Sequence, residues 1–269
     1  MHASDPSLSA DRLVRRVTAL IVLKGVFIAA VLAVIGVVSG AMWLVGVGVL
    51  AGLLVALGAF LFVRGKLKGA VRAVLVDVAA RPVVDDAAPR VTNVVEGLCV
   101  ASGVAEPELW TVVSPAANAM ALDDGTRTAL VITDGLVEHL GLVELEGVVA
   151  NLLGRLKDGS ARLATTAVAV RRLPLSSLYA PDRLLADGLG EQYAVRSDLE
   201  AVRLTRYPPG LRSGLEQASG TGTAVGAGPA DLAHLWLAPS AVGSIEDLPA
   251  SAQTAAQPLD LRIAVLDEL

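Results

Sequence analysis

Two long apolar runs dominate the beginning of the chain. Residues 17–38 are interrupted only by Thr18 and Lys24, and residues 41–63 carry no charge at all. Each run has 22 or 23 residues, and about 20 residues are enough to cross a bilayer as a helix. Because only two residues separate the runs, the pattern predicts a transmembrane helical hairpin over residues 17–63 rather than a cleaved signal peptide.

Basic residues mark both open ends of this hairpin. Arg12, Arg15 and Arg16 precede the first run, and four Lys or Arg residues follow the second within residues 64–72. Because cytoplasmic segments of membrane proteins carry an excess of Lys and Arg, we expect both termini and the main domain to be cytoplasmic. The pattern predicts an integral protein of the cell membrane with the lipid bilayer as a partner. Residues 1–16 are expected to form a cytoplasmic tail that is disordered in its first part.

Beyond the hairpin, the pattern changes from long runs to short periodic segments. Residues 64–89 are expected to form a juxtamembrane helix that continues the second span, followed by a linker rich in Pro and Asp. Apolar residues at helical spacing predict a helix over residues 91–100, and three short apolar runs predict strands. These runs are residues 108–113, 118–122 and 128–133, and a helix is expected after them over residues 134–140.

This mixture of helices and short strands predicts an α+β domain over residues 90–269. Within it, the apolar run at residues 163–170 has eight residues. That length is too short to span a bilayer, so we expect a buried or interfacial helix there. Residues 213–257 are rich in Gly, Ala, Ser and Pro, and much of this stretch is expected to be a mobile loop.

Composition supports the membrane assignment and limits the function. Hydrophobic residues make up 54% of the chain and the mean hydropathy is +0.60, above the range of soluble domains. The part after the hairpin carries 18 basic and 25 acidic residues, which argues against a nucleic-acid partner. The one cysteine, Cys99, cannot form an intramolecular disulfide and is interpreted as a small core residue.

Several short motifs follow one another in a fixed order in this domain. N-A-M-A stands at residues 118–121, T-D-G-L-V-E-H-L at residues 133–140, E-L-E-G-V-V-A at residues 144–150 and L-T-R-Y-P-P-G-L at residues 204–211. In order and spacing they resemble the membrane-anchored zinc metallopeptidases of the HtpX-like heat-shock endopeptidase and CAAX prenyl protease type. The resemblance implies a zincin-like metallopeptidase domain behind the two-helix hairpin. It also implies that the domain faces the cytoplasm.

The chemistry of that family is missing where the resemblance places it. In the family, two His ligands of zinc and a Glu general base follow the E-L-E-x-V-x-A frame, whereas this chain has Asn151, Leu152 and Arg155. The family's third ligand, a Glu, corresponds to Ala194, and only Asp198 is left of its E-x-x-A-D motif. An amide is a poor zinc ligand, leucine has no proton chemistry and a guanidinium cannot coordinate a cation. We therefore predict no catalytic residue, metal or cofactor in this chain, although zinc is the metal of the family.

Two hypotheses concern Arg155, which projects from the position of the second His ligand. Its guanidinium can replace the charge of the metal and pair with Asp198, with Leu152 as an apolar floor. Alternatively, the side chain points to solvent. Two segments near the end of the chain, residues 233–237 and 258–266, resemble carboxy-terminal pieces of the family and are expected to dock on the domain.

Three functions fit these observations. The first is a non-catalytic pseudo-peptidase that binds membrane-protein segments in an inherited groove or regulates an active homologous peptidase, with the strand at residues 118–122 as a peptide-binding edge. The second is an active zinc metalloendopeptidase in membrane protein quality control, with displaced ligands such as Glu191, Asp198 and His234. The third is a membrane anchor without a groove. We predict the first, and the residues expected to line its groove are Asn118, Ala119, Met120, Ala121, Arg155, Asp158 and Asp198.

Overall fold

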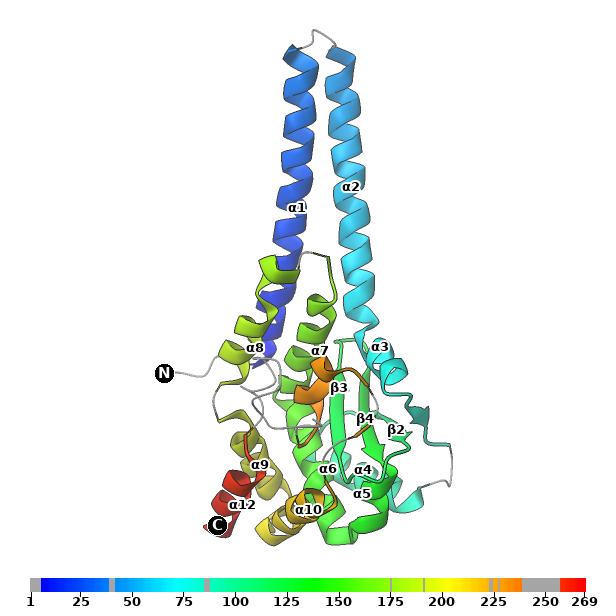
Figure 1. The fold of residues 1–269 in the computed structure, drawn as a ribbon, viewed down its shortest axis with the longest axis vertical. Coiled ribbons are helices and arrows are strands. Elements are labelled where there is room, and N and C mark those ends of the chain that lie inside the picture. The colour runs from blue at the N-terminus through cyan, green and yellow to red at the C-terminus, as the bar shows by residue number, and fades with distance from the viewer. Residues whose placement is uncertain are drawn as a thin grey trace.

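The protein consists of a long helical hairpin that rises from a mixed body of helices and strands (Figure 1). The hairpin is formed by α1 (Pro6–Val38) and α2 (Met42–Lys68). The predicted α+β class is confirmed, with helices in the majority. The computed structural model describes residues 6–38, 42–84, 88–174, 176–190, 192–222, 225–226, 228–238 and 257–269.

The helices of the body follow the hairpin along the chain. Those predicted over residues 91–100 and 134–140 are confirmed, and the apolar run at residues 163–170 lies in a buried helix, α7. The juxtamembrane helix is also confirmed, as α3. The helices are α3 (Ala70–Asp77), α4 (Pro89–Ser102), α5 (Asp134–His139), α6 (Leu142–Lys157), α7 (Ser160–Arg171), η1 (Ser176–Tyr179), α8 (Pro181–Leu189), α9 (Tyr193–Thr205), α10 (Pro208–Thr221), η2 (Ala230–Leu235) and α12 (Leu259–Asp267).

A single four-stranded sheet lies in the body, with the strand order β1-β2-β4-β3. The three predicted strands are confirmed as β2 (Glu108–Val112), β3 (Ala119–Asp123) and β4 (Thr128–Thr133). β4 pairs in parallel with β2 and antiparallel with β3. A further strand, β1 (Arg81–Pro82), pairs antiparallel with β2 inside the segment where only a helix and a linker were predicted. The order leaves β3 at one edge of the sheet.

Both faces of the sheet are buried along β3 and β4. Along β3, Met120 and Leu122 belong to an apolar core shared with α1 and α7, whereas Ala119 and Ala121 belong to a second core shared with α4, α6 and α10. Side chains alternate between the faces of a strand, so one strand serves both cores. Burial on both faces explains why β3 and β4 are continuous apolar runs without polar alternation.

The hairpin helices pack closely along their length. A Cβ atom at Gly25 would lie 2.4 Å from the Cβ of Ala56, and one at Gly52 would lie 2.6 Å from the Cβ of Ala29. Because nonbonded carbon atoms do not approach so closely, these contacts require glycine. By length and composition both helices can cross a membrane, and they are the two helices of this kind in the part of the chain that the structure describes.

The first helix begins earlier than predicted. Residues 6–16 are the first turns of α1, so the prediction of a disordered beginning of the tail is wrong for this part. Ala10, Leu13 and Val17 are fully buried against the body, where α1 contacts α7 and α8. Their spacing of three and four residues forms an apolar stripe on a helix, and the polar residues between them hid it from the hydropathy pattern.

Part of the expected mobile loop is regular structure. In α10, Leu211 and Leu215 are buried against α6, and a Cβ at Gly147 of α6 would lie 2.5 Å from the backbone nitrogen of Leu211. The abundant Gly and Ser residues hid the apolar stripe of this helix. The mobile-loop prediction is also wrong for residues 230–238, which form η2 and a buried extended segment. The prediction that residues 233–237 and 258–266 dock on the domain is confirmed, and residues 239–256 lie outside the described part.

Candidate functional site

The positions that the family resemblance assigned to chemistry lie together inside the body. Asn151, Leu152 and Arg155 sit on α6, and Ala194 and Asp198 sit on α9, which packs against α6. All five are buried. An α-helix places residues three and four apart on one face, which is why the α6 residues face the same neighbours.

A buried ion pair occupies the centre of this region. Arg262 of α12 donates from Nε to Oδ2 of Asp198 and from Nη2 to Oδ1, both at 2.7 Å. The side chains of Arg262 and Asp198 are 0% and 1% exposed. Asn151 donates from Nδ2 to the same Oδ1 at 2.8 Å. Both carboxylate oxygens of Asp198 are therefore engaged, in the bidentate geometry that favours arginine.

Arg155 has a different role from either one predicted. Arg155 is 2% exposed, so its side chain does not point to solvent. It donates from Nη1 to the backbone oxygen of Trp236 at 3.4 Å and lies 5.3 Å from the ring centroid of Tyr193. The prediction that it pairs with Asp198 is wrong, because Arg262 arrives from α12 and takes that place. Leu152 does form a fully buried apolar floor.

The edge of β3 is covered by an extended segment of the same chain, residues 236–238. Met120 and Trp236 form an antiparallel bridge, and the Leu237 N–H donates to the Ala119 oxygen at 2.6 Å. The side chain of Asn118 donates from Nδ2 to the Ala238 oxygen at 2.8 Å and accepts from the Ala238 N–H at 3.2 Å. The segment thus adds to the sheet as a short further strand.

Arg155 and Arg262 bind residues 236–238 from the side opposite to β3. Arg155 binds the Trp236 oxygen, and Arg262 donates from Nη1 to the Leu237 oxygen at 2.7 Å. These hydrogen bonds to residues 236–238 involve the segment's backbone atoms alone. The polar groups of the site therefore bind an extended main chain.

The remaining candidate residues are placed less centrally. Ala121 is buried in the core on the α6 side of the sheet. Asp158 lies just after α6, where its Oδ1 accepts from the Ser160 N–H at 2.8 Å, and burial raises its pKa above the ordinary value. Glu191 lies outside the described residues. His234 contacts the Ala164 oxygen of α7 at 3.4 Å, with Nε2 as the contacting atom.

These residues do not fit a zinc ion. The positions of the family's ligands hold an amide, a cation and a methyl group, and the carboxylate of Asp198 is engaged by Arg262 and Asn151. A buried guanidinium at the position of the second ligand opposes a dication electrostatically. Within the described residues, His, Cys, Asp and Glu form no cluster of three that could hold a metal.

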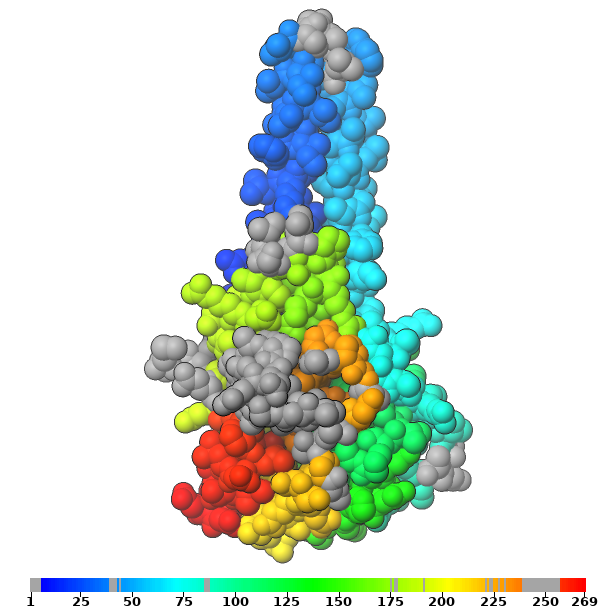
Figure 2. All heavy atoms as spheres, in the orientation of Figure 1, coloured from blue at the N-terminus to red at the C-terminus, as the bar shows by residue number. Residues whose placement is uncertain are grey.

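Sequence reasoning predicted that residues 233–237 and 258–266 dock on the domain, but it missed the ion pair of Arg262 and the backbone pairing of residues 236–238 with β3. One signal for Arg262 was available. Leu259, Ile263 and Leu266 mark the buried side of α12, and Arg262 falls on the same side by the spacing of three and four residues. A charged residue on a buried stripe requires a buried partner. Figure 2 shows α12 beside α10 on the outer surface, from which Arg262 reaches inward.

Comparison with known proteins gives several related peptidases. The chain is 31% identical over 164 residues to a Protease HtpX homolog of Dictyoglomus thermophilum, covering 49% of this chain and 54% of that protein. It is 27% identical over 233 residues to a Protease HtpX homolog of Tropheryma whipplei, covering 71% and 80%. The chain spans about half the length of the Dictyoglomus relatives that it matches. No family model and no solved structure matches the chain.

The buried ion pair predicts a large loss of stability in an Arg262→Ala variant. The substitution leaves the Asp198 carboxylate buried without a cation, and breaking a buried pair in this way costs about 3–5 kcal/mol. The free energy of unfolding of the full chain in mild detergent, measured by denaturant titration, checks this.

Arg212→Ala is the matched control, because Arg212 joins α10 to α12 through Asp267 at the surface. We expect a much smaller change there, since exposed ion pairs are screened by water. Equal losses of unfolding free energy in the two variants would show that the buried pair contributes no more to stability than an exposed pair.

His234 predicts a pH dependence of stability. Burial lowers its pKa to about 3, with the positive charge of Arg171 adding to the effect, whereas an unfolded His has a pKa of about 6.5. Between these values the unfolded chain binds a proton that the folded chain does not. Stability is therefore lost as the pH falls through this window, by at most about 1.4 kcal/mol per pH unit.

A His234→Gln variant is expected to show a shallower fall in its free energy of unfolding over this window. His139→Gln is the control, because His139 is exposed and its removal should leave the slope unchanged. The raised pKa of Asp158 contributes with the opposite sign in all three proteins, so it cancels from the comparison. An unchanged slope in His234→Gln would contradict the assignment.

Proposed function

The chain belongs to the HtpX-like peptidase family, and we propose that it is a non-hydrolytic member that binds extended polypeptide segments at the membrane. The observation that carries the proposal is the hydrogen-bonded network of Asn151, Asp198 and Arg262, with Arg155 beside it, at the positions of the family's chemistry. In this proposal the body is a degenerate zincin-like domain. Its former catalytic helix, α6, has become part of a binding site.

Loss of hydrolysis follows from the residues themselves. A zincin needs two imidazoles and a third ligand to hold the metal, and a carboxylate to take a proton from the bound water. Leu152 offers no base, and it is fully buried in the apolar core. The guanidinium of Arg155 places a fixed positive charge where the second imidazole would coordinate.

The proposed location is the cell membrane, with the body and both termini in the cytoplasm. The hairpin has two basic clusters, at residues 12–16 on α1 and residues 64–68 on α2. Both lie at the end where the helices join the body (Figure 1). By the positive-inside rule, the body and these clusters lie together on the cytoplasmic side. The other end of the hairpin, where α1 ends at Val38 and α2 begins at Met42, would then lie across the bilayer.

The proposed binding mode is addition of a strand to the edge of β3. The resident segment at residues 236–238 is held through its backbone N–H and C=O groups by Asn118, Ala119, Arg155 and Arg262. Any extended polypeptide carries the same groups, so another segment can make the same contacts once the resident one leaves. The partners we propose are extended segments of membrane proteins, which would be exchanged against the resident strand.

Locking the resident segment tests this mode. The Leu237 N–H donates to the Ala119 oxygen, so Met120 and Trp236 are a non-hydrogen-bonded antiparallel pair. The Cα atoms of such pairs are about 4.5 Å apart, which suits a disulfide. A Met120→Cys/Trp236→Cys variant in a Cys99→Ala background should bind a fluorescent peptide with the sequence of residues 233–238 when reduced. When oxidised, it should lose this binding.

The control is Trp236→Cys alone in the same background, whose binding should not change on oxidation. Because the recognised groups are those of the backbone, an unrelated valine-rich hexapeptide should bind the reduced variant as well. The measurement is fluorescence anisotropy on the full chain in detergent. Equal peptide binding by the oxidised and reduced forms would rule out the edge of β3 as the binding site.

Metal content tests the loss of hydrolysis. We expect the purified wild-type chain to contain far less than one zinc per chain by elemental mass spectrometry. The variant Asn151→His/Arg155→His/Ala194→Glu restores the ligand types and should bind about one zinc without cleaving casein. Adding Leu152→Glu supplies the base and should produce casein cleavage.

The variant that lacks Leu152→Glu is the matched control, because it differs from the full set by the base alone. Stoichiometric zinc in the wild-type chain, together with casein cleavage that a chelator stops, would overturn the proposal of a non-hydrolytic protein. Failure of both restored variants to bind zinc, if they remain folded, would argue against a zincin-like body.

A further inference from the structure

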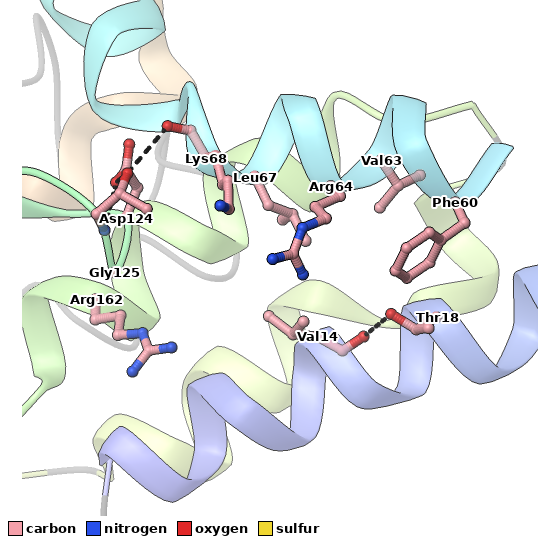
Figure 3. A pocket seen from close by; sticks show the side chains of 11 residues that line it. Val14, Thr18, Phe60, Val63, Arg64, Leu67, Lys68, Asp124, Gly125 and Arg162 are labelled. Carbon is pink, nitrogen blue, oxygen red and sulfur yellow. Dashed lines mark hydrogen bonds between the residues drawn. The ribbon is translucent and has the colours of Figure 1, made fainter. Parts of the chain in front are cut away.

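A pocket of about 180 Å³ lies at the foot of the hairpin, where α1 and α2 enter the body. Figure 3 shows it between the two helices, with the turn that joins β3 to β4 and a side chain of α7 at its inner end. Val14, Phe60 and Val63 give it an apolar wall on the hairpin side. Arg64, Lys68 and Arg162 line the rest together with the turn.

Two of the three basic residues that line this pocket are not paired with a carboxylate in the described part of the chain. Arg64 and Lys68 stand one helical turn apart on α2, and neither forms an ion pair within the described part of the chain. Arg162 pairs with Asp11 at 3.0 Å, at a position where both side chains are partly exposed. The pocket thus keeps an excess of positive charge.

The one carboxylate in the pocket lining, that of Asp124, is occupied by the protein. Its Oδ2 accepts from the Val71 N–H at 3.3 Å, and its Oδ1 accepts from the N–H groups of Thr126 and Arg127, each at 3.0 Å. The hydroxyl of Thr126 also donates to Oδ1 at 2.6 Å. This carboxylate shapes the turn and is not positioned as the partner of Arg64 or Lys68.

Two guanidinium groups, those of Arg64 and Arg162, line the pocket from different helices. Arg162 lies over Gly125, where an added Cβ would meet its Nε and Nη2 at 3.3 Å, so the glycine makes room for it. Arg64 extends from α2 toward the gap above α1, and Arg162 extends toward that gap from α7 (Figure 3). Planar guanidinium groups bind phosphate oxygens in pairs, which a single ammonium cannot do.

The level of the pocket along the hairpin identifies the source of the phosphate. The uncharged run of α2 ends at Val63, and Arg64 is the first charged residue after it. If the hairpin spans the bilayer, this is the depth at which lipid headgroups begin. The pocket volume lies below the roughly 300–1,000 Å³ of sites that enclose a whole small molecule.

We propose that this pocket binds the headgroup phosphate of an anionic phospholipid, whose acyl chains leave the pocket past its apolar wall at Phe60 and Val63. The inference rests on the membrane placement given under the proposed function. Arg64, Lys68 and Arg162 hold the phosphate, and the bound lipid joins the hairpin to the body. An anionic lipid is favoured over a zwitterionic one because the pocket offers no anion free to receive a choline or ethanolamine cation.

Native mass spectrometry of the full chain in detergent, with added phosphatidylglycerol, tests the inference. We expect phosphatidylglycerol to bind and phosphatidylcholine to bind much more weakly. Arg64→Gln/Lys68→Gln should weaken phosphatidylglycerol binding by at least about tenfold, because each basic residue at a membrane surface is worth about 1 kcal/mol. Lys66→Gln is the matched control, since Lys66 lies on the same turn of α2 but does not line the pocket, and it should change binding by less than about twofold.

Three results would overturn the inference. Equal weakening by Lys66→Gln would indicate diffuse attraction to the basic surface, and equal binding of phosphatidylcholine would remove the role of charge. Inorganic phosphate competing as strongly as the lipid at equal concentration would make the site one for a free anion.

Extraction of membranes with alkaline carbonate separates this inference from the proposed function. If the chain stays in the membrane but fails these binding tests, the lipid site alone is contradicted. If the chain is extracted, the membrane placement is contradicted as well.

Discussion

The buried ion pair between Arg262 and Asp198 connects parts of the chain that are far apart in sequence. It joins α12 to α9, draws in Asn151 from α6, and extends through Arg262 to the backbone of Leu237. Each charge would be very unfavourable in the apolar interior by itself, so neither side chain can leave without the other. The packing of these helices and the position of the covering segment therefore depend on one electrostatic contact.

That contact determines what the side chains of α6, at the centre of the body, bind. In the family, the corresponding helix presents its chemistry to a metal and a substrate. Here α6 contributes an amide to a salt bridge, a leucine to the core and an arginine to a backbone oxygen. Arg155 and Arg262 hold the extended segment of residues 236–238 at the edge of β3.

Close contacts through small residues shape the rest of the molecule. Gly25 and Gly52 allow the two hairpin helices to touch, and Gly147 allows α6 to meet α10. Because β3 and β4 are covered on both faces, two separate apolar cores meet at one sheet. The first turns of α1 enter one of these cores, so the hairpin is part of the body at its base rather than attached by a flexible tail.

Hydrophobic period and motif order determined a large part of this protein by themselves. The apolar lengths gave the hairpin, and alternation between short strands and helices gave the α+β class. The ordered motifs indicated the family, and the resemblance placed Asn151, Arg155 and Ala194 at the positions of its zinc ligands and Leu152 at that of its general base. These features are local, because each depends on residues within one helix, one strand or one short motif.

Only the tertiary structure decided which arginine would meet Asp198 and what would cover β3. Arg155 and Arg262 are both cations near the end of a helix, and sequence spacing does not say which is closer to a carboxylate on α9. The answer depends on how α12 docks, and docking is set by the apolar contacts of Leu259, Ile263 and Leu266, which lie more than fifty residues after α9. Residues 236–238 were likewise hidden, because a three-residue strand has no period of its own and exists only where another strand offers its edge.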